Sequence, residues 1–89
     1  MSKWSLEFEP KAEKDLAQLD KAVRARVLEK LDWLLENFDS LFPIPLHNEW
    51  RDFYKLRVGD YRIAYQINWK NNSIKVCYID NRNKIYKRK

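Results

Sequence analysis

The sequence predicts an α+β domain of the order β-α-α-β-β-β, in which a two-helix hairpin packs on one face of an antiparallel sheet. Three observations lead to this prediction. A short run that alternates apolar and polar residues begins the chain, two stretches with helical spacing lie between residues 10 and 37, and three alternating runs joined by short turns fill residues 52–80. Because the helical and the alternating segments are separated along the chain, we expect the helices to cover one side of the sheet.

The first strand and the first helix are predicted from residues 4–19. Trp4, Leu6 and Phe8 alternate with polar residues, which predicts a short strand with one buried face. Pro10 follows, and its missing N–H costs nothing at the first position of a helix. Apolar residues then recur at helical spacing, so this helix is expected to run from Pro10 to about Leu19.

A second, longer helix is predicted after Asp20, whose side chain can accept a hydrogen bond from an exposed backbone N–H of the first turn. The helix should reach about Asn37, because apolar residues repeat at intervals of three and four. These residues are Val23, Val27, Leu28, Leu31, Leu34, Leu35 and Phe38. The link between the helices is only a residue or two, which predicts an antiparallel helical hairpin.

The second half of the chain is predicted to be a meander of strands. Pro43 and Pro45 forbid a continuing helix, so residues 41–48 are expected to form an extended loop. Asn71-Asn72 provides a turn between the last two strands. The expected strands are Asp52–Val58, Tyr61–Asn68 and Ser73–Asp80, and residues 83–89 are expected to form a polar tail or a short helical turn.

The stretch from Phe53 to Gln66 carries the strongest local signal. Gly59-Asp60 separates two alternating runs, and glycine adopts the positive φ of a two-residue turn without steric cost. Counting outward from this turn predicts the cross-strand pairs Val58 with Tyr61, Arg57 with Arg62, Leu56 with Ile63, Lys55 with Ala64, and Tyr54 with Tyr65. Successive side chains point to opposite faces, so Lys55, Arg57, Arg62 and Ala64 share one face. Two directly opposed arginines repel each other by up to about 1 kcal/mol. We therefore hypothesise that this face binds an anion.

Charge is distributed unevenly between the two halves of the chain. Residues 1–49 carry seven Lys/Arg and ten Asp/Glu, whereas residues 50–89 carry eleven Lys/Arg and three Asp/Glu, within a net charge of +5. A basic surface interleaved with aromatic residues is typical of a nucleic-acid contact. The alternative is a solvated basic sheet face that serves solubility.

Length and composition predict one domain, residues 1–89, with enough apolar residues (45%) for a core. No apolar run approaches the roughly 18–20 residues of a membrane span, and the first residues lack the apolar region of a signal peptide. Cys77 is the single cysteine, and there is no Cys/His cluster for zinc. We therefore expect a cytoplasmic protein without membrane contact, metal or other cofactor.

The arrangement of elements, together with the run from Tyr54 to Tyr65 and with Arg82 and Tyr86, resembles the RelE branch of the RelE/ParE toxin superfamily. The resemblance covers nearly the whole chain and is most specific in the Leu-Arg-Val-Gly-Asp-Tyr-Arg segment. It implies a small toxin of a type II toxin–antitoxin pair and a metal-independent endoribonuclease that cleaves mRNA in the ribosomal A site and so inhibits translation. The implied partners are a cognate RelB-like antitoxin, mRNA, and the ribosome with its 16S rRNA.

Five positions match the catalytic residues of that branch. The resemblance makes Lys55 a general base or charge stabiliser, and it makes Arg57 and Arg62 the arginines that hold the scissile phosphate. It assigns Arg82 to stabilisation of the transition state or the leaving group, and Tyr86 to stacking on the substrate nucleotide. The tail residues Lys84, Lys87 and Arg88 are expected to contact the RNA backbone or the antitoxin. Two positions depart from the pattern, because Phe53 stands where some relatives have lysine and Asn81 stands where many have a basic residue.

The residues also allow an RNA-cleaving chemistry in their own right. Attack of a 2′-OH on the adjacent phosphorus needs positive charge around the phosphate oxygens, and arginines offer paired donors to those oxygens. The acid–base assignment stays open, since His47 is the sole histidine and lies outside the basic half, where a structural role is expected, and Glu49 is a further base candidate. Other readings pair Arg57 or Arg62 with Asp52, Asp60 or an acidic antitoxin, or place Tyr86 as a lid on the core.

Two functions from other classes remain as alternatives to the nuclease. A ParE-like toxin shares the fold but inhibits DNA gyrase and leaves RNA intact. A catalytically degenerate member would retain only the fold and its affinity for an antitoxin.

Overall fold

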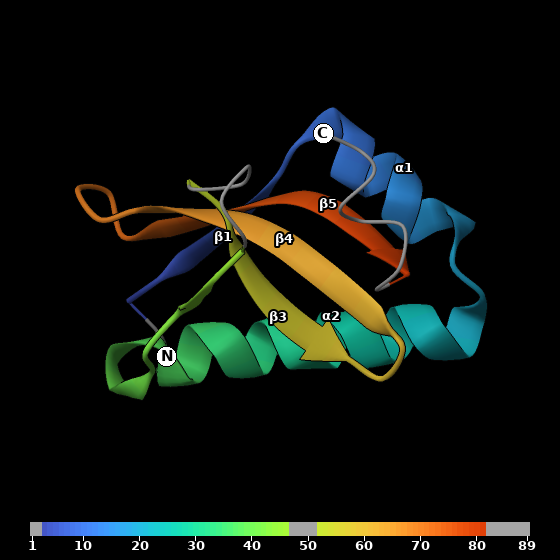
Figure 1. Cartoon of the computed structure of the whole chain (residues 1–89), viewed down its shortest axis with the longest axis horizontal. Helices are drawn as coiled ribbons and strands as arrows, with labels where there is room; N and C mark the ends of the chain where they lie inside the picture. Colours follow the sequence, from blue (N-terminus) through green and yellow to red (C-terminus); the bar gives the residue numbers. More distant parts are fainter. Residues whose placement is uncertain (1–2, 47–51, 82–89) are drawn as a thin grey trace.

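The computed structural model describes residues 3–46 and 52–81, which form a five-stranded sheet of order β1-β5-β4-β3-β2 with two helices (Figure 1). The elements are β1 (Ser5–Phe8), α1 (Pro10–Gln18), α2 (Lys21–Asn37), the short 3₁₀ helix η1 (Phe38–Ser40), β2 (Ile44–Pro45), β3 (Tyr54–Val58), β4 (Tyr61–Asn68) and β5 (Ser73–Asn81). The α+β class and the order of the main elements are as predicted from the sequence.

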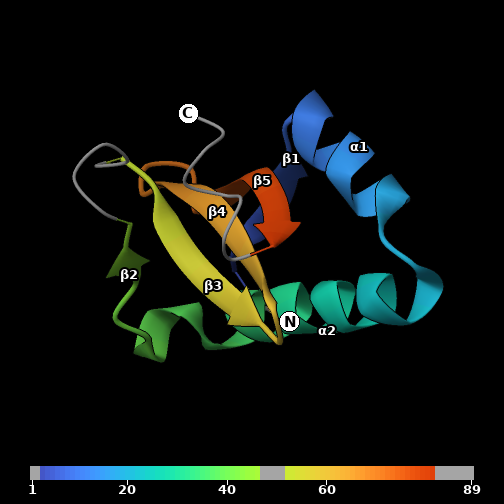
Figure 2. The same cartoon turned by 45° about the vertical axis from the view of Figure 1, so that its right-hand side comes forward.

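Both helices begin where their capping residues were expected. Pro10 is the first residue of α1, and the Asp20 carboxylate accepts a hydrogen bond from the Val23 backbone N–H at 2.9 Å. The helices contact different parts of the twisted sheet, α1 against β1 and β5 and α2 against β3. They therefore diverge from their junction instead of lying side by side as a hairpin (Figures 1 and 2). In the described part of the chain, neither helix is long and apolar enough to cross a membrane.

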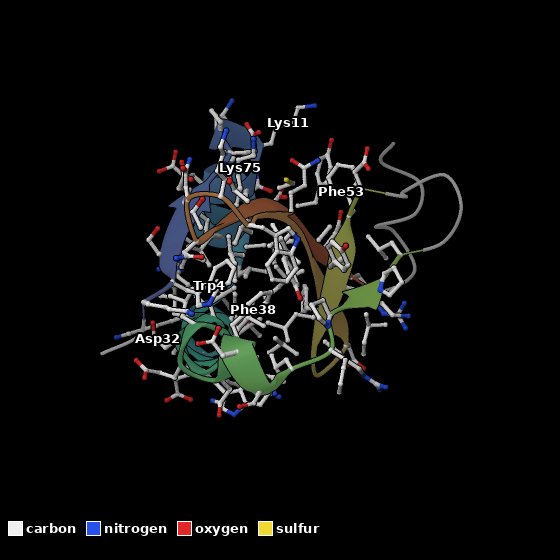
Figure 3. All side chains as sticks on the ribbon, turned by 90° about the vertical axis from the view of Figure 1, so that its left-hand side faces the viewer. Trp4, Lys11, Asp32, Phe38, Phe53 and Lys75 are labelled. Carbon is white, nitrogen blue, oxygen red and sulfur yellow. The ribbon has the colours of Figure 1, made fainter. Side chains whose placement is uncertain are left out.

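One hydrophobic core lies between the helices and the inner face of the sheet. Val27, Leu31 and Leu34 of α2 are fully buried, in keeping with their helical spacing, whereas Leu28 is 40% exposed and does not belong to the buried stripe as expected. Trp4 and Phe38 close one end of this core with ring centroids 4.5 Å apart (Figure 3). Both belong to the core cluster together with Val27, Leu31 and Leu34, so this face of α2 packs against the inner face of the sheet.

Two features of the sheet differ from the sequence-based prediction. β1 pairs with β5 in parallel, from Ser5 opposite Ser73 to Phe8 opposite Val76, so the sheet is mostly rather than entirely antiparallel. Residues 44–45, expected in an extended loop, form the edge strand β2 against β3. Pro45 is tolerated there because an edge strand leaves one side of its backbone without a ladder.

A bulge at Cys77 changes which side chains of β5 reach each face. Ala64 of β4 pairs with Tyr78, but Tyr65 pairs with Val76, so Cys77 is the extra residue. Val76 and Ile79 therefore both point into the core, although they are three residues apart. The bulge also brings Tyr78 to the face opposite the core, which we call the outer face.

β1 pairs only with Ser73–Val76 of β5, and α1 contacts the part of β5 that follows. An Asp15 carboxylate oxygen accepts a hydrogen bond from the Ile79 backbone N–H at 3.0 Å. This contact ties α1 to the part of β5 that carries outer-face residues.

Candidate nucleic-acid interface

The β3–β4 hairpin has the turn and the register that the sequence predicts. Gly59 adopts a φ of 58°, and Asp60 is not among the described residues with positive φ, which is the pattern of a type II′ turn. All five expected pairs are present, from Val58 opposite Tyr61 to Tyr54 opposite Tyr65. Arg57 therefore lies directly opposite Arg62, on the same face of the sheet.

The outer face presents its polar side chains in two cross-strand rows. The first row is Lys55, Ala64 and Tyr78, and the second is Arg57, Arg62 and Asp80. Neighbouring strands lie about 4.7–4.9 Å apart, and residues two apart on one strand are separated by roughly 6.4–6.8 Å. Three cations and one carboxylate thus lie within the reach of one another's side chains. We call these two rows the basic rows.

Arg57 occupies the rim of the basic rows. It is exposed, and its Nε donates a hydrogen bond to the Gly59 carbonyl oxygen at 3.2 Å. β2 pairs only with Tyr54 and Lys55, so β3 is an edge strand at this position. Arg57 also lines a hollow whose α2 side consists of Arg26, Glu29, Lys30 and Trp33.

Arg62 occupies the centre of the basic rows and is half-buried. Arg57 lies across from it on one side and Asp80 on the other. Sequence reasoning weighed Asp52 and Asp60 as acidic partners and missed Asp80. Strict alternation from Ile74 and Val76 would have turned Asp80 inward, and only the bulge at Cys77 brings it outward. A carboxylate beside a guanidinium restricts its orientation and offsets part of the repulsion from Arg57.

Five of the predicted site residues lie outside the described residues: Arg82 and Tyr86 among the catalytic candidates, and Lys84, Lys87 and Arg88 among the RNA-binding ones. His47 and Glu49 also lie outside them. The structure brings together Lys55, Arg57 and Arg62, and the roles of all the predicted site residues stay predictions.

Sequence reasoning also missed a small apolar cluster beside the basic rows. Ala64 and Leu46 are buried there, and Phe53 and Tyr78 pack against them. The ring centroids of Phe53 and Tyr78 are 6.3 Å apart. No local signal marks this pair, because their contact depends on the register of two strand pairings.

Burial raises the pKa of two titratable groups of the sheet. It raises the pKa of the Cys77 thiol to about 11, and, with the nearby Tyr54, it raises the pKa of Tyr65 to about 12. Both groups are protonated at neutral pH. The charge of the outer face therefore comes from its lysine, arginine and acidic side chains.

Comparison with known families identifies the chain. Residues 6–86 match the model of the family described as the ParE toxin of the type II toxin–antitoxin system parDE. The chain belongs to this toxin family. The match includes both helices, the basic rows and, apart from Ser5 of β1, the described strands. No curated protein matches the chain.

Solved structures place this ParE-family toxin within the RelE/ParE superfamily. The toxin of the RelBE2 toxin–antitoxin complex of Mycobacterium tuberculosis is 25% identical over 89% of this chain and 98% of that chain, with a TM-score of 0.78. The archaeal RelE–RelB complex of Pyrococcus horikoshii gives 27% identity, 92% and 98% coverage and a TM-score of 0.71. A mutant form of Escherichia coli RelE in the free state gives 26% identity, 97% and 90% coverage and a TM-score of 0.75. The fold of the toxin is therefore the RelE fold.

Proposed function

We propose that this toxin is a RelE-type endoribonuclease that blocks translation by cutting mRNA in the ribosomal A site. The observation that carries the proposal is the placement of Arg57 directly opposite Arg62, with Lys55 in the adjacent row, on the outer face of the sheet. Three like charges held together by the backbone cost folding free energy. A phosphate of a ribose-phosphate chain turns that repulsion into attraction.

The proposed reaction forms a bond between the 2′-oxygen and phosphorus and breaks the bond from phosphorus to the 5′-oxygen. The products are a 2′,3′-cyclic phosphate and a 5′-hydroxyl. Arg62, from its central position, donates hydrogen bonds to the non-bridging oxygens on which negative charge grows, and Arg57 adds donors from the rim. Lys55 stabilises charge as an ammonium or, in its neutral amine form, accepts the 2′-OH proton. Arg82 assists the departing 5′-oxygen, which takes up a proton to leave as the 5′-hydroxyl, and Tyr86 stacks on the nucleotide. This arrangement needs no metal ion.

An antitoxin is the second proposed partner. The similar toxins from M. tuberculosis and P. horikoshii were solved as RelBE2 and RelE–RelB complexes. We infer that a RelB-like antitoxin neutralises this toxin by covering the basic rows or by displacing the C-terminal segment. Acidic residues of such an antitoxin would occupy the positions that the RNA phosphates occupy in the substrate complex.

The family description favours a second candidate function, because the matched model is that of ParE toxins. A ParE-like toxin would arrest DNA gyrase and leave mRNA intact. The two candidates differ in what they require of the outer face. The proposed cleavage of RNA needs the clamp formed by Arg57 and Arg62, whereas inhibition of gyrase involves no cleavage of RNA.

Induced expression followed by mapping of mRNA 5′ ends separates these functions. We expect new 5′ ends within coding regions for the natural toxin, and their loss together with toxicity in Arg62→Ala. Lys14→Ala is the matched control, since Lys14 is an exposed cation on α1 outside the basic rows. Toxicity with intact mRNA and inhibited gyrase would select the ParE-like function.

A further inference from the structure

An aromatic pocket lies on the outer face beside the basic rows. Its volume is about 410 Å³, within the range of roughly 300–1,000 Å³ that is usual for ligand sites. It is lined by Phe53, Gln66, Cys77 and Tyr78 of the sheet region and by residues 9–11 at the beginning of α1. Figure 3 shows Phe53, Lys11 and Lys75 along one side of the molecule, and Asp32 of α2 on the opposite side.

The pocket is part of the same cross-strand arrangement as the phosphate clamp. Ala64 pairs with Lys55 on one side and with Tyr78 on the other, so Tyr78 belongs to the first basic row. Ala64 is fully buried, and its small side chain lets Phe53 pack across it toward Tyr78. The two rings are tilted by 42° to each other. A planar group that stacks on these rings lies near Ala64, which is two residues from Arg62 on β4.

The remaining groups of the pocket supply hydrogen bonds and positive charge. The Gln66 side-chain oxygen lies 3.8 Å from the Cys77 thiol, and the Gln66 amide can both donate and accept. The Lys11 ammonium lies 6.0 Å from the centre of the Tyr78 ring. Glu9, the one acid of the lining, is 3.2 Å from Lys75, which offsets its charge. Aromatic walls, an amide edge and flanking cations together match a nucleobase carried on a phosphate chain.

We propose that this pocket binds one base of the RNA substrate adjacent to the cleaved phosphate and thereby sets which base is preferred there. The inference rests on the proposed nuclease function and deepens it. The scissile phosphate lies at Arg57 and Arg62, the neighbouring base stacks on Phe53 and Tyr78, and the next phosphate approaches Lys11. Gln66 contacts the hydrogen-bonding edge of the base and is the residue that distinguishes one base from another.

Binding of an uncleavable RNA tests the pocket separately from the reaction. The probe is a fluorescently labelled RNA hexanucleotide whose 2′-oxygens are all methylated, so attack by a 2′-OH is impossible. We expect Tyr78→Leu and Phe53→Leu each to weaken binding by roughly 5- to 150-fold, the usual contribution of one base stacked on an aromatic ring. Tyr78→Phe should bind as the natural toxin does. Phe42→Leu is the matched control, because Phe42 is 94% exposed and remote from the pocket lining.

A set of abasic hexanucleotides shows whether the rings act on a base. Removal of the base that occupies the pocket should weaken binding to the natural toxin by the same factor as Tyr78→Leu, and the two changes combined should cost little more than either alone. Independent losses that simply add would overturn the proposal. Unchanged RNA binding in both leucine variants would also overturn it. This holds even if both variants bind an antitoxin more weakly. Thermal unfolding of each variant verifies that the fold is retained.

The outcomes separate this inference from the nuclease function. Base-dependent binding through Tyr78 and Phe53 without mRNA cleavage keeps the pocket and removes the nuclease. Cleavage of mRNA with an unchanged base preference in both leucine variants keeps the nuclease and removes the pocket. A natural toxin that neither binds the hexanucleotide nor cuts mRNA overturns both.

Discussion

Replacement of Arg62 by alanine is the most direct test of the phosphate clamp. Arg62 is half-buried at the centre of the basic rows, between Arg57 and Asp80. A preorganised donor at a site of developing negative charge contributes roughly 2.7–4 kcal/mol, so Arg62→Ala should slow single-turnover cleavage by about 10²- to 10³-fold. Arg57→Ala should slow cleavage less, by about tenfold. This factor corresponds to the lower end of the roughly 1.5–3 kcal/mol that a hydrogen bond to a charged group contributes. Arg57 is exposed at the strand edge, and its Nε already donates to Gly59.

The assay is single-turnover cleavage on ribosomes that carry a defined codon in the A site. Arg62→Lys keeps the charge but loses the planar pair of donors, so its rate should fall between those of the natural toxin and Arg62→Ala. Lys14→Ala should leave the rate unchanged. The unfolding temperature of Arg62→Ala should change little. The substitution relieves a like-charge repulsion of up to about 1 kcal/mol, but it also removes the cationic neighbour of Asp80. A full rate for Arg62→Ala would refute the clamp, and a larger loss for Arg57→Ala than for Arg62→Ala would refute the placement argument.

Three further predictions concern the framework of the site. Asp15→Ala should lower the free energy of unfolding by about 1–3 kcal/mol, since it removes the acceptor of the Ile79 N–H; denaturant unfolding measures this, with the exposed Glu13→Ala as control. Gly59→Ala should lower the free energy of unfolding by about 1–2 kcal/mol in the same assay, because the residue at this turn has a φ of 58°. A neutral or stabilising substitution would contradict the assigned turn. Burial raises the pKa of Tyr65 from 10.0 to about 12, so the folded state holds a proton that the unfolded state has lost, and stability should fall as the pH rises from about 10 to 12. Tyr65→Phe should flatten that part of the stability-versus-pH curve, and an equally steep fall in the variant would exclude Tyr65 as the cause.

Local sequence information was sufficient for the hairpin that carries Arg57 and Arg62. Gly59 sets the turn, alternation sets the faces, and together they pair Arg57 with Arg62. These residues are close in sequence, so few alternative registers compete. The helix limits were equally local, since Asp20 and Pro10 act within one helical turn of their own positions.

Local sequence information could not predict the pairings between segments that are distant along the chain. β1 and β5 are separated by most of the chain, and their parallel pairing depends on how both pack over the helices. The bulge at Cys77 places both Val76 and Ile79 in the core. Its consequence is the presence of Tyr78 and Asp80 on the outer face.

The sequence by itself determined the α+β class, the helix limits and the opposed arginines, because turn chemistry and periodicity act over a few residues. Only the tertiary structure decided that Asp80 pairs with Arg62 and that Phe53 packs near Tyr78 beside the basic rows. Those contacts follow from a one-residue shift in strand pairing, and such a shift is selected by the packing of the whole core.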